Sequence, residues 1–557
     1  MSPEITIKSD SLKKCIFFLF VFSLCGILSV HSETTDKDRY NNTIYQWETD
    51  LNSVPEKDAS NKRRAFLWIP PKCQQLRGLI VSGHNALEEG LLEDSLFRAA
   101  MTELNFGELW VTPDFEPSGV FDASKGAQTS FMEAINELAE ESGYEELKYV
   151  PVVYISHSAQ ASSPWNFGAW NPEKALALIS FHGDSPRSTY LCCNHHNPDW
   201  GNRHIDGIPG LICIGSDEWT EFRVEDSFRF MKQYPNSVIS LLCNAGRGHG
   251  DFSQEDLKYL IRFIQKAVQH RMPVTWDGKN QMVLKRIDRK NGWLADRWHR
   301  NSLPAAGTSP FAGYGGNRDS AYWYFDEEMA RWTESIYERQ RNKKKQYLTM
   351  MQNGRILKKE ERLAFITDGK SFEINAKAVF TDSTYKRLSE AHTIEPIRLK
   401  RYSGPVQIVN DTTFRINFYR PGVLHKRATN IGLFAFAESD YLYGHAVCHF
   451  SWKMEKQLKE GKKQSIVFPK VENVPCNAVC VKLKAKSNCN LPVQYYVRSG
   501  PAYIDKGTLY ISEIPVKAKY PIKITVVAWQ YGSMVDPKVQ TAQAVEQSLY
   551  IINTCQQ

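Results

Sequence analysis

The chain contains three residue types that together can carry out nucleophilic catalysis. A serine, a pair of acids and a histidine each follow an apolar, strand-like run: Ser158, then Asp217 and Glu218, then His249. A serine hydroxyl becomes a nucleophile when a histidine takes its proton, and a carboxylate then fixes the tautomer of that histidine. We therefore expect Ser158 to be the nucleophile, His249 the base, and Glu218 the acid in preference to Asp217. The simpler alternatives are a helix-capping serine and a surface-loop histidine.

The residues around Ser158 decide whether its hydroxyl can be presented on a sharp turn. A strand-like segment precedes it, and a helical segment containing Pro and Trp follows. A strand–turn–helix bend pushes the hydroxyl out over the sheet edge and requires small residues two positions before and two after the nucleophile. Ser156 meets this requirement, whereas Gln160 departs from it.

An acyl-transfer site also needs N–H donors for the oxyanion that forms at the attacked carbonyl. These are usually the amide after the nucleophile and one from the loop after an early strand. Ala159 is expected to supply the first donor. His84, or less favourably Asn85, is expected to supply the second because both follow the strand-like residues 79–82. His84 has the plain alternative of a hydrogen-bonded loop histidine.

Alternating strands and helices are predicted to position these residues in an α/β domain. Strands that are apolar on both faces and alternate with helices indicate a mainly parallel sheet covered by helices. After about residue 363, short alternating segments separated by turn residues predict one or two all-β sandwich modules. The predicted strands of the α/β part are 65–69, 79–82, 109–112, 150–155, 176–181, 210–214 and 238–242, and its helices are 128–141, 221–233, 254–270 and one after 158.

Residues 63–273 resemble the α/β-hydrolase superfamily through the segments 156–158, 215–218 and 248–250. Within it the secreted esterase branch with trailing β modules fits best. The resemblance implies ester hydrolysis through an acyl-enzyme, without a metal or other cofactor. Residues 491–532 resemble the immunoglobulin-like tail modules of secreted bacterial polysaccharide-processing proteins.

The N-terminus predicts export from the cytoplasm. Lys13 and Lys14 precede an apolar run at 15–30, which is typical of a secretory signal peptide cut near Ser32. The alternative is a membrane anchor, but the run is shorter than the roughly 20 residues that span a bilayer. We expect a secreted or periplasmic protein with no membrane span in the mature chain. The predicted parts are a signal peptide (1–32), a flexible leader (33–61), the α/β-hydrolase domain (62–273), an aromatic and helical connector (274–362), a β-rich module (363–465) and an immunoglobulin-like β-sandwich (466–557).

The cysteines suit a disulfide better than a metal site. Export permits disulfides, and Cys476, Cys480 and Cys489 are close enough in sequence to form one. No histidine or cysteine pair stands near them at the spacing of a zinc finger. Residues 192–200 contain two cysteines and two histidines, but a substrate loop between strands is favoured over a metal site there.

The composition limits the classes of binding partner that are expected. The 557 residues are 42% hydrophobic and 24% charged, as in folded globular chains of several domains, and the formal net charge of +7 is too small to favour nucleic acid. Trp165, Trp200 and Trp219 lie near the expected triad in sequence. They are candidates for stacking on sugar rings in a substrate, although core packing is the commoner fate of a tryptophan.

These features predict a secreted serine esterase that removes methyl, acetyl or aromatic acyl groups from polysaccharide. One alternative is a catalytically lapsed hydrolase scaffold that acts as a secreted glycan-binding protein. The presence of Gln160 supports this alternative. A serine peptidase is a third option, although no propeller repeat accompanies the domain.

Overall fold

The computed structural model describes residues 43–54, 62–189, 195–358, 361–422 and 429–553. The predicted signal peptide, most of the predicted leader, and Cys192 and Cys193 lie outside them. The described residues all belong to one compact unit. Among the described residues, no helix combines the length and the apolar character needed to cross a membrane. The predicted domain boundaries, export and oligomeric state stay predictions.

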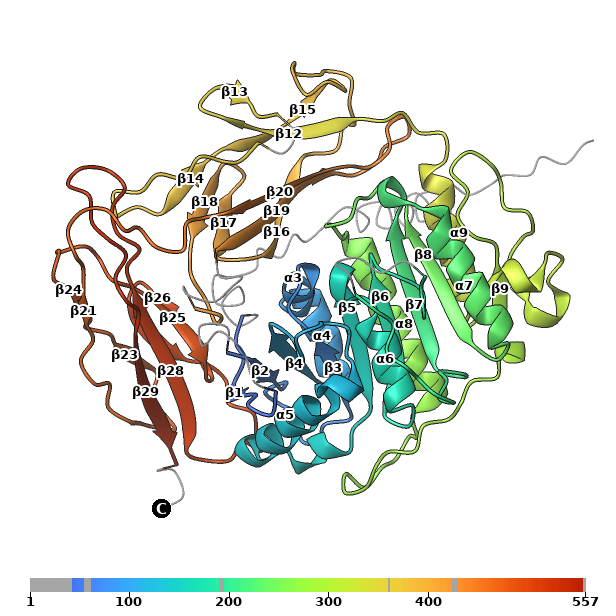
Figure 1. Cartoon of the computed structure of the whole chain (residues 1–557), viewed down its shortest axis with the longest axis horizontal. Coiled ribbons are helices and arrows are strands. Elements are labelled where there is room, and N and C mark those ends of the chain that lie inside the picture. The colour runs from blue at the N-terminus through green and yellow to red at the C-terminus, as the bar shows by residue number, and fades with distance from the viewer. Residues whose placement is uncertain (1–42, 55–61, 190–194, 359–360, 423–428, 554–557) are drawn as a thin grey trace, which may run out of the picture. The chain divides into compact units, whose positions relative to one another are not determined.

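A mainly parallel eight-stranded sheet forms the first part of the fold (Figure 1). Neighbouring strands from β4 to β8 are parallel, whereas β1 and β2 add antiparallel pairs at one edge. The predicted α/β class is confirmed, and the sheet with its helices fits the α/β-hydrolase fold. In sheet order the strands are β1 (Trp47–Asp50), β2 (Arg64–Trp68), β4 (Phe106–Thr112), β3 (Gly78–Ser82), β5 (Val152–His157), β6 (Ala175–Phe181), β7 (Pro209–Gly215) and β8 (Val238–Asn244).

Strand β1 lies inside the segment predicted to be a flexible leader, which corrects that prediction for residues 43–54. It pairs antiparallel with β2, and Tyr45 and Trp47 are buried beside it. Two large aromatic side chains bury enough apolar area to hold such a short edge strand in place.

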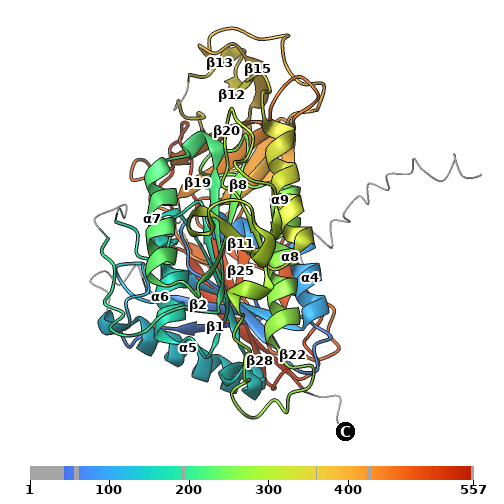
Figure 2. The same ribbon diagram turned by 90° about the vertical axis from the view of Figure 1, so that its right-hand side faces the viewer.

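Helices cover both faces of the sheet. In Figure 2, α5, α6 and α7 lie on one side of the strands and α4, α8 and α9 on the other. All strands from β3 to β8 are completely buried, as expected for a sheet covered on both faces. The helices are α3 (Leu87–Leu92), α4 (Ser95–Leu104), α5 (Ala127–Ser142), α6 (Ser163–Trp170), α7 (Glu221–Gln233), α8 (Gln254–Arg271) and α9 (Glu327–Gln340).

The aromatic connector packs against the far edge of the sheet. A small sheet of β9 (Trp293–Ala295), β10 (Ser309–Pro310) and β11 (Tyr322–Tyr324) lies there, and the three aromatic residues of β11 are buried. The hydroxyl of Tyr324 donates a hydrogen bond to the carbonyl of Leu241 in β8 at 2.7 Å. Core packing therefore accounts for these aromatic residues.

Small sheets of two to four strands make up the remainder, consistent with the predicted β modules, and the immunoglobulin-like arrangement stays a prediction. Cys476 is disulfide-bonded whereas Cys480 and Cys489 are free, so the three cysteines do not pair among themselves. The strands are β12 (Tyr347–Gln352), β13 (Arg355–Ile356), β14 (Glu373–Asn375), β15 (Lys377–Thr381), β16 (Arg398–Ser403), β17 (Val406–Asn410), β18 (Thr413–Ile416), β19 (Asn430–Ala437), β20 (Ala446–Lys453), β21 (Ile466–Val467), β22 (Val474–Pro475), β23 (Cys480–Lys482), β24 (Lys486–Ser487), β25 (Gln494–Ser499), β26 (Ala502–Asp505), β27 (Thr508–Ile511), β28 (Ile522–Trp529) and β29 (Val545–Ile552).

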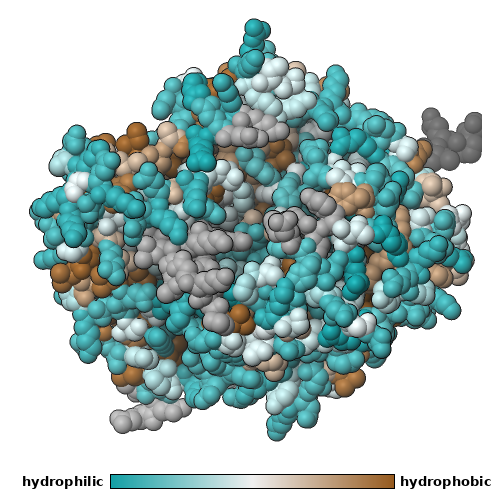
Figure 3. Space-filling model, viewed as in Figure 1, coloured by the Kyte–Doolittle hydropathy of each residue, from teal (hydrophilic) through white to brown (hydrophobic). Residues whose placement is uncertain are grey.

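Buried ion pairs join this β-rich part to the sheet domain. Arg401 of β16 lies 2.7 Å from Glu89 of α3, and Arg420 pairs with Glu93 just beyond the same helix. All four side chains are largely shielded from water, and breaking such a pair leaves an uncompensated charge. The β-rich part is therefore built onto the sheet domain. On the face shown in Figure 3, hydrophobic residues form separated patches among hydrophilic ones.

Candidate active site

Ser158 stands at the turn between β5 and α6. Strand β5 ends at His157, and a single helical turn, Ser158–Gln160, leads toward α6. The backbone of Ser158 has φ +56°, in the left-handed region that costs a residue with a side chain about 1 kcal/mol or more. A strained serine between a parallel strand and a helix is the geometry that presents a nucleophile.

The turn accommodates Gln160 because its neighbour is a glycine. The Gln160 side chain is buried, and its amide donates a hydrogen bond to the carbonyl of Pro113 at 3.2 Å. A Cβ placed on Gly83 would lie only 2.5 Å from Oε1 of Gln160. Because Gly83 has no side chain, the turn does not need a small residue at position 160. Ser158 therefore keeps its strained geometry.

Replacing Gly83 by alanine is expected to disturb this turn. The new methyl group overlaps the buried Gln160 amide, and such overpacking typically costs about 1–3 kcal/mol. Thermal unfolding of Gly83→Ala, Gln160→Ala and the double variant measures the coupling between the two sites. We expect the double variant to be more stable than the sum of the single effects; strict additivity would show that Gln160 does not fill the space at Gly83.

Ser158, His249 and Glu218 converge at the carboxyl end of the sheet. The Ser158 hydroxyl lies 2.5 Å from Nε2 of His249, and Nδ1 of His249 is hydrogen-bonded to Oε2 of Glu218. Glu218 ends a helical turn that follows β7, and His249 lies in the loop after β8. The three predicted residues therefore form a continuous chain of hydrogen bonds.

Asp217, the alternative acid, points elsewhere. Its side chain is half exposed, and its nearest cation is Arg300 at 3.8 Å. Its backbone N–H donates to the carbonyl of Arg247, which helps to hold the loop that bears His249. Between the two neighbouring acids, the structure brings only Glu218 to the histidine.

The environment of Glu218 keeps its carboxylate ionised. Burial acts to raise the pKa of Glu218, but hydrogen bonds from His182 and His249 outweigh burial and hold that pKa well below its usual range. A permanently charged carboxylate is suited to stabilising an imidazolium that forms beside it.

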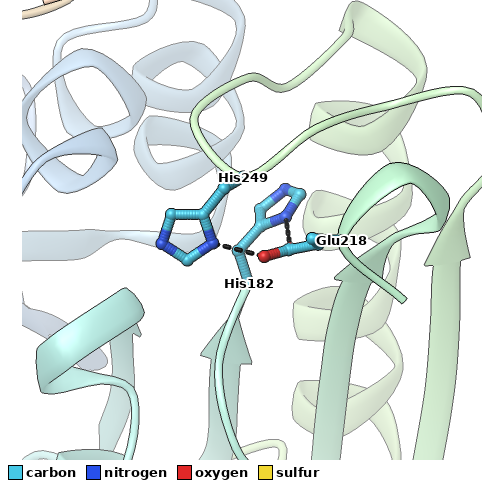
Figure 4. A group of neighbouring side chains, drawn as sticks. All are labelled: His182, Glu218 and His249. Carbon is cyan, nitrogen blue, oxygen red and sulfur yellow. Dashed lines mark hydrogen bonds and ion pairs between the residues drawn. The ribbon is translucent and has the colours of Figure 1, made fainter. Parts of the chain in front are cut away.

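Two further histidines at this site were missed in the sequence analysis. His182 directly follows β6, is completely buried, and places Nδ1 2.5 Å from Oε1 of Glu218 (Figure 4). His157 donates from Nε2 to the backbone carbonyl of His249 at 2.8 Å, and burial lowers its pKa well below the usual value, aided by the nearby charges of His249 and His182. The available signal was their position at the carboxyl ends of parallel strands, where functional groups gather.

His182, Glu218 and His249 are also the residue types that hold zinc. Their candidate ligand atoms lie within 4.8 Å of one another. Two ligands on a tetrahedral zinc ion stand about 3.3 Å apart, given zinc–nitrogen distances of roughly 2.0–2.1 Å. The 2.5 Å separation between His182 and Glu218 is shorter and matches a direct hydrogen bond.

Of the two predicted oxyanion donors, the structure contradicts one. The N–H of His84 donates to the carbonyl of Pro113 at 3.2 Å, and its ring lies 2.7 Å from the Thr112 hydroxyl, so His84 is a hydrogen-bonded loop histidine. Asn85, the weaker alternative, uses its side-chain amide to donate to the carbonyl of His157 at 2.8 Å. Ala159 stands at the start of a helical turn, where the first N–H groups have no partner within the turn.

The predicted sugar-stacking tryptophans divide into two groups. Trp165 and Trp200 are buried in the core, where their indole N–H groups bond to the Asp184 carbonyl and to Asn166, both at 2.8 Å. With no ring face open to a ligand, these two predictions are wrong. Trp219 is only partly buried, directly follows Glu218, and stays a candidate for substrate contact.

The β-rich part holds the loop that bears His249. Arg247 is buried in that loop and pairs with Glu438 at 3.0 Å, just beyond β19, while its guanidinium lies 2.6 Å from His445. Strand β20 also packs closely, because a Cβ on Gly250 would lie 2.6 Å from the ring of His449. The position of His249 therefore depends on residues almost two hundred positions further along the chain.

Several solved structures are each similar to about two fifths of the chain, and no family model or curated protein sequence matches it. Est1E from Butyrivibrio proteoclasticus is 16% identical with a TM-score of 0.26, covering 40% of this chain and 97% of its own. LpqC, a poly(3-hydroxybutyrate) depolymerase from Bordetella parapertussis, is 12% identical with a TM-score of 0.29, covering 42% and 96%. A truncated carbohydrate esterase from gut microbiota is 11% identical with a TM-score of 0.29, covering 41% and 98%. At these values the activity has to be inferred from the geometry of the site.

Proposed function

We propose that this chain is a serine hydrolase that cleaves carboxylic esters through Ser158, His249 and Glu218. The observation that carries the proposal is the unbroken hydrogen-bonded chain from the Ser158 hydroxyl through both ring nitrogens of His249 to Glu218. The strained backbone at Ser158 supports it, because such strain is retained where it serves to present a reactive group.

The reaction proceeds in two halves. Nε2 of His249 takes the hydroxyl proton as Oγ of Ser158 attacks the ester carbonyl, and the N–H of Ala159 donates to the resulting oxyanion. Collapse of this intermediate breaks the ester bond, and His249 returns the proton to the departing alcohol. Water then attacks the acyl-serine with His249 again as base, which releases the acid and restores Ser158. Glu218 stabilises the imidazolium in both halves.

We propose ester-decorated polysaccharide as the substrate of a secreted enzyme, with methyl, acetyl or aromatic acyl groups as the esters removed. Support comes from the signal-peptide pattern and from partly exposed Trp219 beside the acid. The alternative, a lapsed scaffold that binds glycans, rested on Gln160. Since Gly83 makes room for that side chain, Gln160 no longer weighs against catalysis.

The test is an assay of the purified mature chain on p-nitrophenyl acetate, pectins and xylans. We expect release of p-nitrophenol, and of methanol, acetate or ferulate from at least one polysaccharide, with no change of rate on addition of a chelator. Loss of the rate with chelator would instead favour metal-assisted hydrolysis through the group around Glu218. Glycan binding without release of any product would support the lapsed scaffold.

A further inference from the structure

Glu218 is held by two histidines rather than one. His249 bonds to Oε2, whereas His182 lies 2.5 Å from Oε1, so each carboxylate oxygen has its own imidazole (Figure 4). The three side chains come from the segments after β6, β7 and β8, three neighbouring parallel strands. In the mechanism above only His249 exchanges a proton with substrate, which leaves His182 without a role.

His182 is placed to support the site and not to touch the substrate. It is completely buried, and the ring of Phe181 packs against it at 4.7 Å. Its backbone has φ +48°, a conformation that histidine adopts only at a cost in free energy. This strained backbone aims the ring at Glu218.

Both ring nitrogens of His182 face groups of the protein. Nδ1 lies 2.5 Å from the carboxylate of Glu218, and a carboxylate only accepts, so Nδ1 donates this hydrogen bond. Nε2 lies 3.1 Å from the backbone carbonyl of Asp251 and 3.3 Å from the side-chain amide nitrogen of Asn244. The ring is therefore held on both edges.

A ring held on both edges links the acid to the loop that bears His249. One edge fixes Glu218, and the other holds Asp251, two residues beyond His249. With Oε1 occupied, only Oε2 is left for His249, so the carboxylate cannot rotate away from its partner.

We propose that His182 is a positioning residue that fixes Glu218 and the Asp251 end of the catalytic loop in register. The inference rests on the proposed function, since it assigns Glu218 and His249 their roles in ester hydrolysis. It adds a fourth residue to the constellation, one that acts only through the other three.

Two amide variants separate the two edges of the ring. In His182→Asn the side-chain amide can take the place of Nδ1 and still donate to Glu218, and asparagine tolerates the positive φ. In His182→Gln the amide reaches the place of Nε2, toward Asp251, but Oε1 of Glu218 loses its imidazole donor and keeps only the backbone N–H of Gly215 at 3.1 Å. We expect His182→Asn to retain kcat within about tenfold of the wild type and His182→Gln to lose about 10- to 100-fold, as is typical for residues that orient a functional ligand.

The readouts distinguish positioning from general stability. Rates are referred to the number of Ser158 residues labelled by a fluorophosphonate, so unfolded protein does not count. For His182→Gln we expect kcat to fall with KM changed less than about twofold, because His182 acts on Glu218 and does not touch the substrate. An unchanged kcat per labelled site in His182→Gln would overturn the proposal.

A measurement independent of activity keeps this proposal separate from the proposed function. In the proton NMR spectrum of histidine-labelled protein, the wild type should show two far-downfield imidazole N–H signals from the two bonds to Glu218. His182→Asn should remove one and His249→Asn the other. A wild type that neither labels at Ser158 nor hydrolyses esters, yet shows both signals, would refute the proposed function alone. A single signal, assigned to His249, would refute the role of His182.

Discussion

Replacing Ser158 by alanine is expected to lower kcat on p-nitrophenyl acetate by at least about three orders of magnitude, the scale seen when a serine nucleophile is removed. Alanine keeps Cα and Cβ but lacks the Oγ that lies 2.5 Å from His249, so no acyl-serine can form. The fold should be retained, since both residues have similar difficulty with the φ of +56°. Steady-state kinetics and the mass of the fluorophosphonate adduct measure the effect.

Ser156→Ala is the matched control, two residues earlier and within β5. The Ser156 hydroxyl is buried and, within the described ranges, has no hydrogen-bond partner. Its removal also keeps the small side chain that the turn requires. We expect wild-type kcat and full labelling of Ser158 in this variant. Equal rates for Ser158→Ala and the wild type would show that another group is the nucleophile.

The sheet domain and the triad could be predicted from local sequence because their signals are local. Apolar runs such as 176–181 and 238–242 become β6 and β8 because strands covered on both faces need no polar alternation. A parallel sheet then carries whatever follows each strand to the same edge, which is why Ser158, Glu218 and His249 meet. The choice of Glu218 over Asp217 also follows from their places in one short turn.

The features that sequence analysis missed depend on contacts between distant segments. Gln160 looked too large for the turn at Ser158 because Gly83, which makes room for its side chain, lies 77 positions earlier and outside the motif around Ser158. Trp165 looked available to a sugar because a sequence position near the triad does not reveal that this side chain of α6 is buried in the core. The N–H of His84 looked free because its partner, Pro113, lies on another loop. Glu218, the hydrogen-bond partner of His182, lies 36 positions further along the chain, and only the folded sheet brings the two together.

The contact of the β-rich part with the His249 loop also joins distant segments, so it could not be predicted from local sequence. Arg247 reads as one basic residue in a glycine-rich loop, and its acidic partner Glu438 lies 191 positions away. Because this guanidinium is buried between Glu438, Asp251 and His445, the β-rich part contributes to the catalytic geometry. An appended binding module would not be expected to make such contacts, so the β-rich part helps to hold the loop of the candidate active site.

Glu218→Gln is expected to lower kcat by about three to four orders of magnitude, as when the carboxylate of such a triad becomes an amide. Glu218 accepts from His182 on one oxygen and from His249 on the other. A glutamine has one acceptor and one donor end, so one histidine must face an N–H. If that histidine is His249, it adopts the tautomer that cannot take the proton of Ser158. Even if the amide turns the other way, the charge that stabilises the imidazolium is lost. Kinetics at pH 6 to 9 measure the effect.

Asp217→Asn is the matched control, because it makes the same chemical change one residue earlier. Asp217 is half exposed and lies 3.8 Å from Arg300, and an exposed pair at that distance contributes little. Its backbone N–H, which bonds to the Arg247 carbonyl, is untouched by the substitution. We expect kcat within about threefold of the wild type and an unchanged pH profile. A large loss in Asp217→Asn together with a small loss in Glu218→Gln would reverse the assignment of the acid. In that case the contacts of His182 and His249 with Glu218 would have no role in catalysis.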